Sequence, residues 1–582
     1  MLLRLGHRFA CCGISTLIAC SSTDGGHASH AGGGAADAPS ARAGSGSAPS
    51  GTGGDSATLG QAGDGGEAGD AQVVRPPSNL IPARVRRLAN AEYDGSVQTL
   101  LQTQQSPASD PDFPPDLRRD GFTVNASQRV DAVIIERLAD AADALATEAE
   151  QNGTLARLAP CAAKDDPVDC ARQFITTFGA KAYRRPLIDE EVEALLTLYT
   201  VGADGASYQD GIAHVTRGLL QSAGFLYVTE LGNGEPSADG IVQLTPYELA
   251  ASLAYFLTSA PPDEELITQA KSGKLSDPAE REAQARRLFS SQPRAKDTAV
   301  RLVREWLGID RIDDSAKDTL IYPNFVQDKP SIVAESTDFV RAVAFQSTGN
   351  VSELFGAHWT VNSGPLSLYQ TAGAGPVPGS TLLGDRVGIL NQAAFLATYA
   401  QAHESHPVFR GVAIAQRVTC MGLDSPASFN IQVVPPLPDP TLTTRERYSE
   451  HSTNEICAGC HKIIDPFGFS FEHYDGMGQY RELDNGKNVD SVVTVATGRD
   501  FDGPYADSNQ LAEALARSTT VRECFARYMF RASAGTGDGA ATPGESEFVE
   551  SIRALPTATQ GSIVETLISN VKATNFAVRS AP

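Results

Sequence analysis

One pentapeptide of the sequence combines thiols and an imidazole at a spacing that can do chemistry, namely Cys457-Ala458-Gly459-Cys460-His461. Two thiols at this spacing can each add to a vinyl group of one porphyrin, and the adjacent imidazole can then bind its iron. The motif therefore predicts one covalently bound haem c, with Cys457 and Cys460 as attachment sites and His461 as the proximal ligand. Two other interpretations stay open. One is a Cys457–Cys460 disulfide, and the other is a zinc site, which would need further ligands although the sequence has no second Cys-x-x-Cys.

Several residues in the sequence could be the distal ligand, which takes the sixth coordination position of the haem iron. Met477, His473 and His451 stand near the motif. A Met ligand raises the iron potential and a His ligand lowers it, whereas an open position allows chemistry on a bound ligand. His403 and His406 are also close to each other, but no third ligand accompanies them, so we expect surface or loop histidines there.

Arginines flank the pentapeptide. Arg445 and Arg447 precede it and Arg481 follows it. A guanidinium can pair with a haem propionate through two parallel hydrogen bonds, and it can equally form ordinary ion pairs with neighbouring carboxylates. The sequence leaves both roles open.

The start of the chain has the pattern of an export signal. Arg4, His7 and Arg8 form a basic start, and a short apolar run leads to Leu17-Ile18-Ala19-Cys20, which resembles a bacterial lipobox. We therefore expect residues 1–19 to be a signal peptide and Cys20 to carry lipid, which anchors the chain in a membrane. Ser21 after the cysteine favours the outer membrane by the same resemblance. The other interpretation is an ordinary secretory signal.

The segment after the signal is expected to be disordered, and the overall charge limits the classes of function. Residues 21–70 hold 15 of the 53 glycines, no aromatic residue and one large aliphatic residue, Leu59, so we expect a disordered tether. It can serve as a spacer from the membrane or be a neutral insert. A formal charge of −23 argues against a nucleic-acid binder. No apolar stretch is long enough for a spanning helix.

The rest of the chain has to position the pentapeptide, and it has the periodicity of helices in series. Tyr93, Val97 and Leu100 follow Asn90 on one helical face, and Pro186 is expected to begin another helix. Thr245 and Glu248 form a capping box. Further helices are predicted over 278–290, 296–308, 331–347 and 386–401. The periodicity predicts a mainly α fold class, and the pentapeptide predicts a small cytochrome-c-like module near the C-terminus.

We expect seven segments in chain order. They are a lipoprotein signal peptide (1–19), a disordered tether (20–76), a helical N-terminal module (77–155), a helical module with Cys161 and Cys170 (156–230), a large helical module (231–372), a cytochrome-c-like module (373–498) and a C-terminal helical module (499–582). Cys161 and Cys170 flank a polar loop, and their spacing suits a local disulfide in an exported protein.

Several short motifs, in one order along the chain, resemble the planctomycete-type multidomain cytochrome-like proteins, which also occur in myxobacteria and are mostly of unknown function. The motifs are Arg87–Asp94 with Phe113–Asp116 and Gly121-Phe122, Phe178-Gly179 with Ala182–Leu187, Leu244–Ala250, Arg410-Gly411 with Arg445–Arg447, Cys457–His461, Asp465-Pro466 and Gly468-Phe469, and Ser518–Tyr528. The resemblance implies a planctomycete cytochrome C module around the pentapeptide. It also favours His451 over Met477 as distal ligand. After Arg531 the chain departs from the pattern, which puts the last module's boundary in doubt.

The remaining cysteines can now be assigned. Of the nine cysteines, Cys11 and Cys12 leave with the signal peptide, Cys20 takes lipid, Cys161 and Cys170 can pair locally, and Cys457 and Cys460 take haem. Cys420 and Cys524 are left, and we predict that they pair. The expected protein is a membrane-anchored c-type cytochrome-like protein of the bacterial cell envelope that transfers electrons to a redox partner protein or acts on a polymer. The sequence leaves open whether it is a haem-dependent oxidoreductase. The alternative is a non-catalytic scaffold or polymer-binding lipoprotein with a Cys457–Cys460 disulfide.

Overall fold

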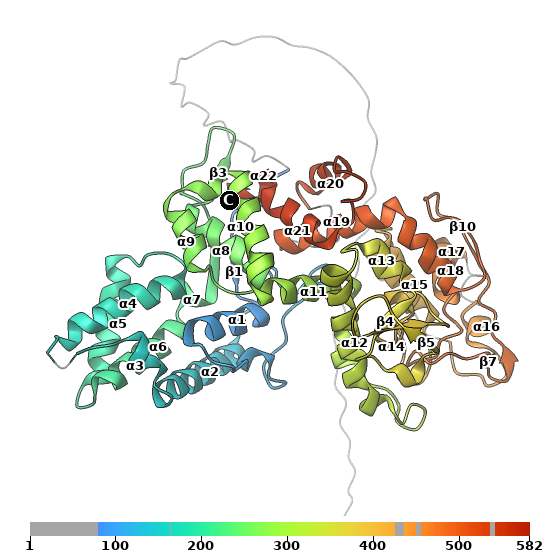
Figure 1. The fold of residues 1–582 in the computed structure, drawn as a ribbon, viewed down its shortest axis with the longest axis horizontal. Helices are drawn as coiled ribbons and strands as arrows, with labels where there is room; N and C mark the ends of the chain where they lie inside the picture. The colour runs from blue at the N-terminus through green and yellow to red at the C-terminus, as the bar shows by residue number, and fades with distance from the viewer. Residues whose placement is uncertain (1–78, 163, 425–435, 450–454, 536–541, 582) are drawn as a thin grey trace, which may run out of the picture. The chain divides into compact units, whose positions relative to one another are not determined.

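The described residues of the computed structural model are 79–162, 164–424, 436–449, 455–535 and 542–581, and they are predominantly helical (Figure 1). The predicted mainly α fold is confirmed. The predicted signal peptide, Cys20, the predicted tether and His451 lie outside the described residues. Within the described ranges, no helix is both long enough and apolar enough to cross a membrane.

The first group of elements, blue and cyan in Figure 1, contains a hydrophobic core of its own. Its elements are β1 (Arg84–Arg87), α1 (Asn90–Leu101), α2 (Ala132–Gln151), α3 (Thr154–Leu158), α4 (Pro167–Tyr183), α5 (Asp189–Ala203), α6 (Tyr208–Gln221), α7 (Ala223–Leu226) and β2 (Tyr227–Glu230). The apolar stripe of α5 packs against α6. This helix begins at Asp189 and not at Pro186 as predicted, because the Glu191 carboxylate accepts a hydrogen bond from the Ile188 N–H and caps the helix there.

A second group of elements contributes to another, more extensive hydrophobic core, which we call the main core. They are β3 (Ile241–Gln243), α8 (Pro246–Thr258), α9 (Glu264–Lys271), α10 (Pro278–Ser291), α11 (Pro293–Leu307), α12 (Phe325–Gln346), α13 (Val351–Gly356), β4 (Trp359–Val361), β5 (Thr371–Ala374), β6 (Ser380–Leu383) and α14 (Ala393–Thr398). The predicted capping box of Thr245 and Glu248 starts α8. The prediction of one helix over 386–401 is wrong. Gly388 has a φ of 68° and Gln392 is extended (φ −80°, ψ 153°), so the segment divides into a 3₁₀ turn over Ile389–Asn391 and the short α14.

The C-terminal elements are α18 (Ser508–Arg517), α19 (Thr519–Ala534), α20 (Glu545–Arg553), α21 (Ile563–Lys572) and α22 (Thr574–Ala577), followed by β11 (Val578–Ser580). Residues of α18, α19, α21 and α22 join the main core, whereas Phe548 and Ile552 of α20 pack in a separate smaller cluster with Phe530 of α19. Trp306 of α11 is fully buried, and its ring lies 5.0 Å from Phe525 and 6.5 Å from Tyr528 of α19. The large, cytochrome-c-like and C-terminal modules therefore share one hydrophobic core, and the boundaries assigned to them stay predictions.

Short antiparallel strand pairs join segments that are far apart in the sequence. β1 pairs with β2, β3 pairs with β11, and β6 lies between β4 and β5. The buried Glu230 carboxylate of β2 accepts hydrogen bonds from Arg84 of β1 and Arg579 of β11, each at 2.7 Å. One carboxylate thus connects the first and last strands of the described chain.

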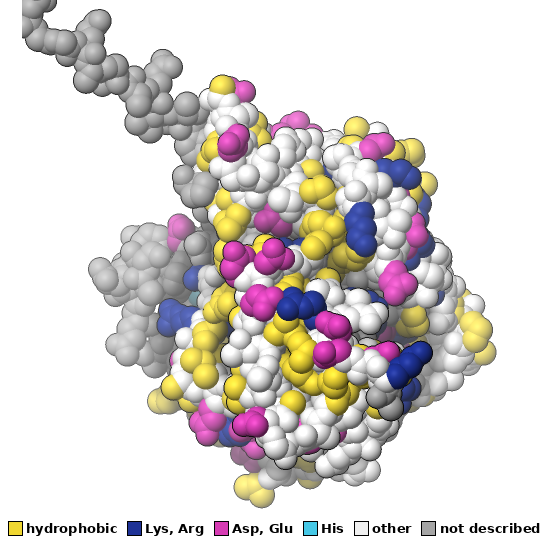
Figure 2. Space-filling view, turned by 90° about the vertical axis from the view of Figure 1, so that its left-hand side faces the viewer, with side chains coloured by type: hydrophobic (Ala, Val, Ile, Leu, Met, Phe, Trp, Pro, Cys, Tyr) yellow, Lys and Arg dark blue, Asp and Glu magenta, His cyan; other side chains and the backbone are white. Residues whose placement is uncertain are grey.

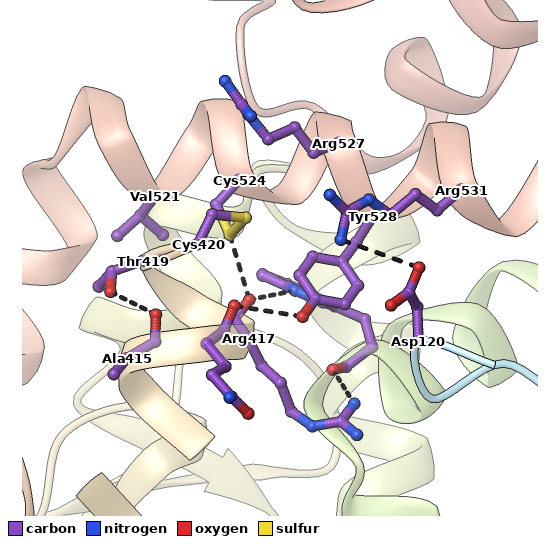
Figure 3. Close-up of a disulfide and its surroundings, with 12 residues drawn as sticks. Asp120, Ala415, Arg417, Thr419, Cys420, Val521, Cys524, Arg527, Tyr528 and Arg531 are labelled. Atoms are coloured by element: carbon purple, nitrogen blue, oxygen red, sulfur yellow. Dashed lines mark hydrogen bonds and ion pairs between the residues drawn. A yellow bond between two sulfur atoms is a disulfide. The ribbon is translucent and has the colours of Figure 1, made fainter. Parts of the chain in front are cut away.

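Both predicted disulfides, Cys161–Cys170 and Cys420–Cys524, are present in the structure. The second joins the residues after the π-helical turn η6 (Ile414–Val418) to α19, as Figure 3 shows. Beside it, Tyr528 donates a hydrogen bond to the Gln416 carbonyl at 3.1 Å. These contacts attach η6 to α19 of the C-terminal helices.

Charges of both signs are interspersed on the face of the molecule shown in Figure 2. Asp and Glu side chains alternate there with Lys, Arg and apolar side chains. On that face the negative charge of the chain is therefore not gathered into one continuous patch.

Candidate functional site

The pentapeptide lies at the beginning of α17 (Glu455–Phe469), which follows α16 (Thr444–Ser449). On a helix, residues at i, i+3 and i+4 share one face, so the structure brings Cys457, Cys460 and His461 together. Both thiols are partly exposed and neither forms a disulfide. The arrangement therefore offers two nucleophilic sulfur atoms and an imidazole to one ligand.

The imidazole of His461 is oriented by a carboxylate one turn further along α17. Its Nδ1 atom lies 2.7 Å from Oδ1 of Asp465, and the two side chains are only 14% and 11% exposed. A carboxylate at Nδ1 makes Nε2 the nitrogen through which the ring would bind a metal. In the sequence, Asp465 stands out only as part of a family motif, although an i+4 spacing from His461 would signal this contact if the segment is helical.

A cavity of about 390 Å³ lies beside His461. It is lined by Arg445, Ala458, His461, Lys462, Asp465, Pro466, Phe469, Val493 and Thr494. The Arg445 guanidinium lies 5.1 Å from the centre of the Phe469 ring, and it donates hydrogen bonds to the carbonyls of Asp490 and Val492, each at 2.9 Å. The cavity thus combines apolar walls with a positioned positive charge.

Two glycines let α17 lie directly on α15 (Pro407–Ala413). A Cβ atom on Gly468 would stand 2.0 Å from the Pro407 carbonyl oxygen, and one on Gly411 would stand 2.2 Å from the Ile464 carbonyl oxygen. Any side chain at either position would overlap the backbone of the other helix. The close contact fixes the helix that carries the pentapeptide against the main core.

Arg410 secures the chain segment that leaves α17. Its buried guanidinium donates hydrogen bonds to the carbonyls of Leu396, Phe471, Tyr474 and Asp475, at 2.6 to 3.2 Å. Burial lowers the pKa of Arg410 to about 10. The residue therefore acts as a structural bridge between α14 and the turn after α17, a role that its place in a sequence motif does not reveal.

Two candidate distal ligands, Met477 and His473, are not among the residues that line this cavity. Met477 is 4% exposed and packs in the main core. His473 places Nδ1 2.9 Å from the Arg481 carbonyl and stacks on Tyr480. His451 lies outside the described residues, so the sixth ligand stays a prediction.

His403 and His406 do not form a metal pair in the structure. His403 is exposed, and its Nε2 lies 3.8 Å from a Glu404 carboxylate oxygen. His406 lies in the loop before α15, as the expectation of surface or loop histidines allowed, and it is buried there. Its Nδ1 accepts the Phe409 N–H at 3.1 Å and caps α15. Nowhere in the described chain do three or more His, Cys, Asp or Glu side chains converge in a way that could hold a metal ion.

Comparison with protein families gives four matches that follow one another along the chain. They are PSD3, protein of unknown function (DUF1587), over 86–151, PSD5, protein of unknown function (DUF1595), over 170–230, PSD4, protein of unknown function (DUF1592), over 244–369, and PSCyt3, protein of unknown function (DUF1588), over 386–484. The last match contains the pentapeptide, Asp465, Arg410 and both crossing glycines. Comparison with curated proteins and with solved structures found no match. The chain therefore belongs to the planctomycete-type multidomain cytochrome-like proteins, a family of unknown function.

Proposed function

We propose that the chain is a c-type cytochrome-like protein that carries one haem on Cys457 and Cys460, with His461 as the proximal ligand, and transfers electrons through it. The observation that carries this proposal is the set of two unbonded thiols and an oriented imidazole on one face of α17. The other cysteines in the described residues are all in disulfides. The contrast favours an attachment role for Cys457 and Cys460 over a disulfide between them.

The two thiols, the imidazole and the side chains around them suit a covalently bound haem. The two thiols would hold the porphyrin, Nε2 of His461 would bind the iron, and Arg445 would pair with a propionate as a bidentate donor. When bound, the haem supplies one-electron redox chemistry. Phe469 and Val493 would exclude water from part of the porphyrin face. His451 remains the favoured distal ligand, since Met477 is committed to the main core.

The same proposal places the protein in the bacterial cell envelope. Cys20, lipidated after removal of residues 1–19, would anchor it to a membrane, and the lipobox followed by Ser21 favours the outer membrane. Haem c is attached outside the cytoplasm, which agrees with an exported chain. The partner would be a redox protein or a polymer substrate at the envelope, and no nucleic acid is expected.

A second candidate is a polymer-binding lipoprotein without haem, in which Cys457 and Cys460 form a disulfide. It is favoured by a cavity of about 770 Å³ near the β1–β2 pair, whose lining includes Tyr183, Tyr227 and Tyr247. Tyrosine rings offer flat apolar surfaces with a polar edge, which suit a polymer. The two candidates differ in one measurable property, the presence of covalent haem.

Covalent haem can be tested on the mature chain, Cys20 to Pro582, expressed in a host that attaches haem c in its periplasm. We expect an intact mass increased by one haem and a reduced-minus-oxidised spectrum of a c-type cytochrome. The double variant Cys457→Ser/Cys460→Ser should lose both signals. The matched control Cys161→Ser/Cys170→Ser should keep them. A wild-type chain without haem, in cells that mature another c-type cytochrome, would contradict the proposal and favour the second candidate.

A further inference from the structure

The hydrogen-bond partner of His461 is a carboxylate, that of Asp465. Metal-bound imidazoles generally donate their second ring N–H to a backbone carbonyl, a water molecule or a carboxylate. Here the acceptor is a carboxylate at 2.7 Å, and both side chains are largely buried. A charged acceptor in a site with little water strengthens this hydrogen bond and increases the electron density on the ring.

We propose that Asp465 is a positioning residue that makes His461 a stronger donor to the haem iron and so stabilises the ferric over the ferrous state. The inference rests on the proposed function, because it concerns a haem bound through His461. A more basic ring stabilises the higher charge of ferric iron, so the reduction potential falls. The expected protein is one that gives up electrons more readily than it would with a neutral hydrogen-bond acceptor at this position.

Other charges near the cavity act differently and provide a control. Arg445 and Lys462 line the cavity and favour the ferrous state by their positive charge. Asp490 pairs with Arg445 at 3.2 Å, and its side chain is 61% exposed. Asp490→Asn therefore removes the same unit of negative charge as Asp465→Asn, close to the same cavity, without changing the hydrogen bond of His461.

The test is a redox titration of the haem-loaded wild type and of Asp465→Asn, Asp465→Ala and Asp490→Asn. We expect Asp465→Asn to shift the ferrous-to-ferric ratio at a given potential by about tenfold towards ferrous iron, which for one electron raises the midpoint by about 59 mV. Asp465→Ala should raise it at least as much, and Asp490→Asn should raise it clearly less. Asn keeps the shape of Asp, so Asp465→Asn decides the result if the alanine variant does not fold.

The outcomes separate this inference from the proposed function. A wild type that carries haem, with equal midpoints in the wild type and Asp465→Asn, would overturn the role of Asp465 and leave the proposed function standing. An equal rise in Asp490→Asn would also overturn it, since charge alone would then account for the effect. A wild type without haem would overturn the proposed function and this inference with it.

Discussion

The protonation of a buried carboxyl group depends on burial and on its few hydrogen-bond partners. Glu335 of α12 is an example. The side chain is completely buried, and it accepts hydrogen bonds from the hydroxyls of Thr360 and Tyr369, each at 2.5 Å. Burial raises the pKa of Glu335 to about 7, against the lowering effect of these donors and of Arg386. The carboxyl group therefore keeps its proton in the folded state at pH values where the unfolded chain has lost it.

We expect the stability of the wild type to fall between pH 4.5 and pH 7 relative to Glu335→Gln. The raised pKa means that the folded state binds the proton more tightly than the unfolded state, so this contribution is complete below pH 4.5 and is lost as the pH rises through 7. The difference should reach roughly 3 kcal/mol. Urea unfolding of both proteins across this range measures it. A constant difference in unfolding free energy would contradict the raised pKa.

At the scale of elements, the contact between α15 and α17 depends on the absence of side chains. Gly411 and Gly468 each face a carbonyl oxygen of the opposite helix at a distance that excludes a Cβ atom. Gly459, on the same helix as Gly468, has no atom within 4 Å of its Cβ position. The two glycines of α17 thus differ in environment while sharing one helix, which makes them a matched pair.

We expect Gly468→Ala to destabilise the haem-free protein by roughly 2–4 kcal/mol, because the backbones of α15 and α17 must move apart. The control Gly459→Ala should be neutral or should stabilise by up to about 1 kcal/mol, since alanine is the better helix former. Denaturant unfolding of the two variants and the wild type provides the comparison. Equal stabilities of the two variants would show that the helices do not pack as closely as described.

For the whole molecule, covalent and ionic connections join distant parts of the chain. The Cys420–Cys524 disulfide spans 104 residues, whereas Cys161–Cys170 spans 9. A disulfide that closes a longer loop removes more entropy from the unfolded chain. The first bond connects the region of the pentapeptide with the C-terminal helices, and the second is local to the N-terminal helices.

Removing the long-range disulfide should therefore cost more than removing the local one. In the chain-entropy account we expect a loss of about 4–5 kcal/mol for Cys420→Ser/Cys524→Ser and about 2–3 kcal/mol for Cys161→Ser/Cys170→Ser. Unfolding under non-reducing conditions measures both, and each variant serves as the control for the other. A larger loss for the local pair would mean that native-state strain, and not loop length, governs these bonds.

The sequence by itself determined the features that depend on spacing along the chain. Apolar residues at helical intervals indicated the mainly α class, and the pentapeptide indicated the two thiols and the imidazole of the candidate site. The cysteine spacing and count led to the two disulfides. The order of the motifs led to the family. Each of these depends on residues whose relation is local or can be settled by counting.

Only the tertiary structure decided which distant groups meet. Three contacts join segments whose local sequences do not indicate the partner. They are the hydrogen bonds of Arg410 to backbone carbonyls, those of Glu230 to two arginines, and the glycine contact between α15 and α17. Met477 was one of several candidate ligands near the motif, ranked below His451, and packing places it in the main core. Gly388, with its positive φ, and the extended Gln392 interrupted a segment for which periodicity had predicted one helix. The physical reason is that long-range packing and buried hydrogen bonds are satisfied in three dimensions, where separation along the chain does not measure distance.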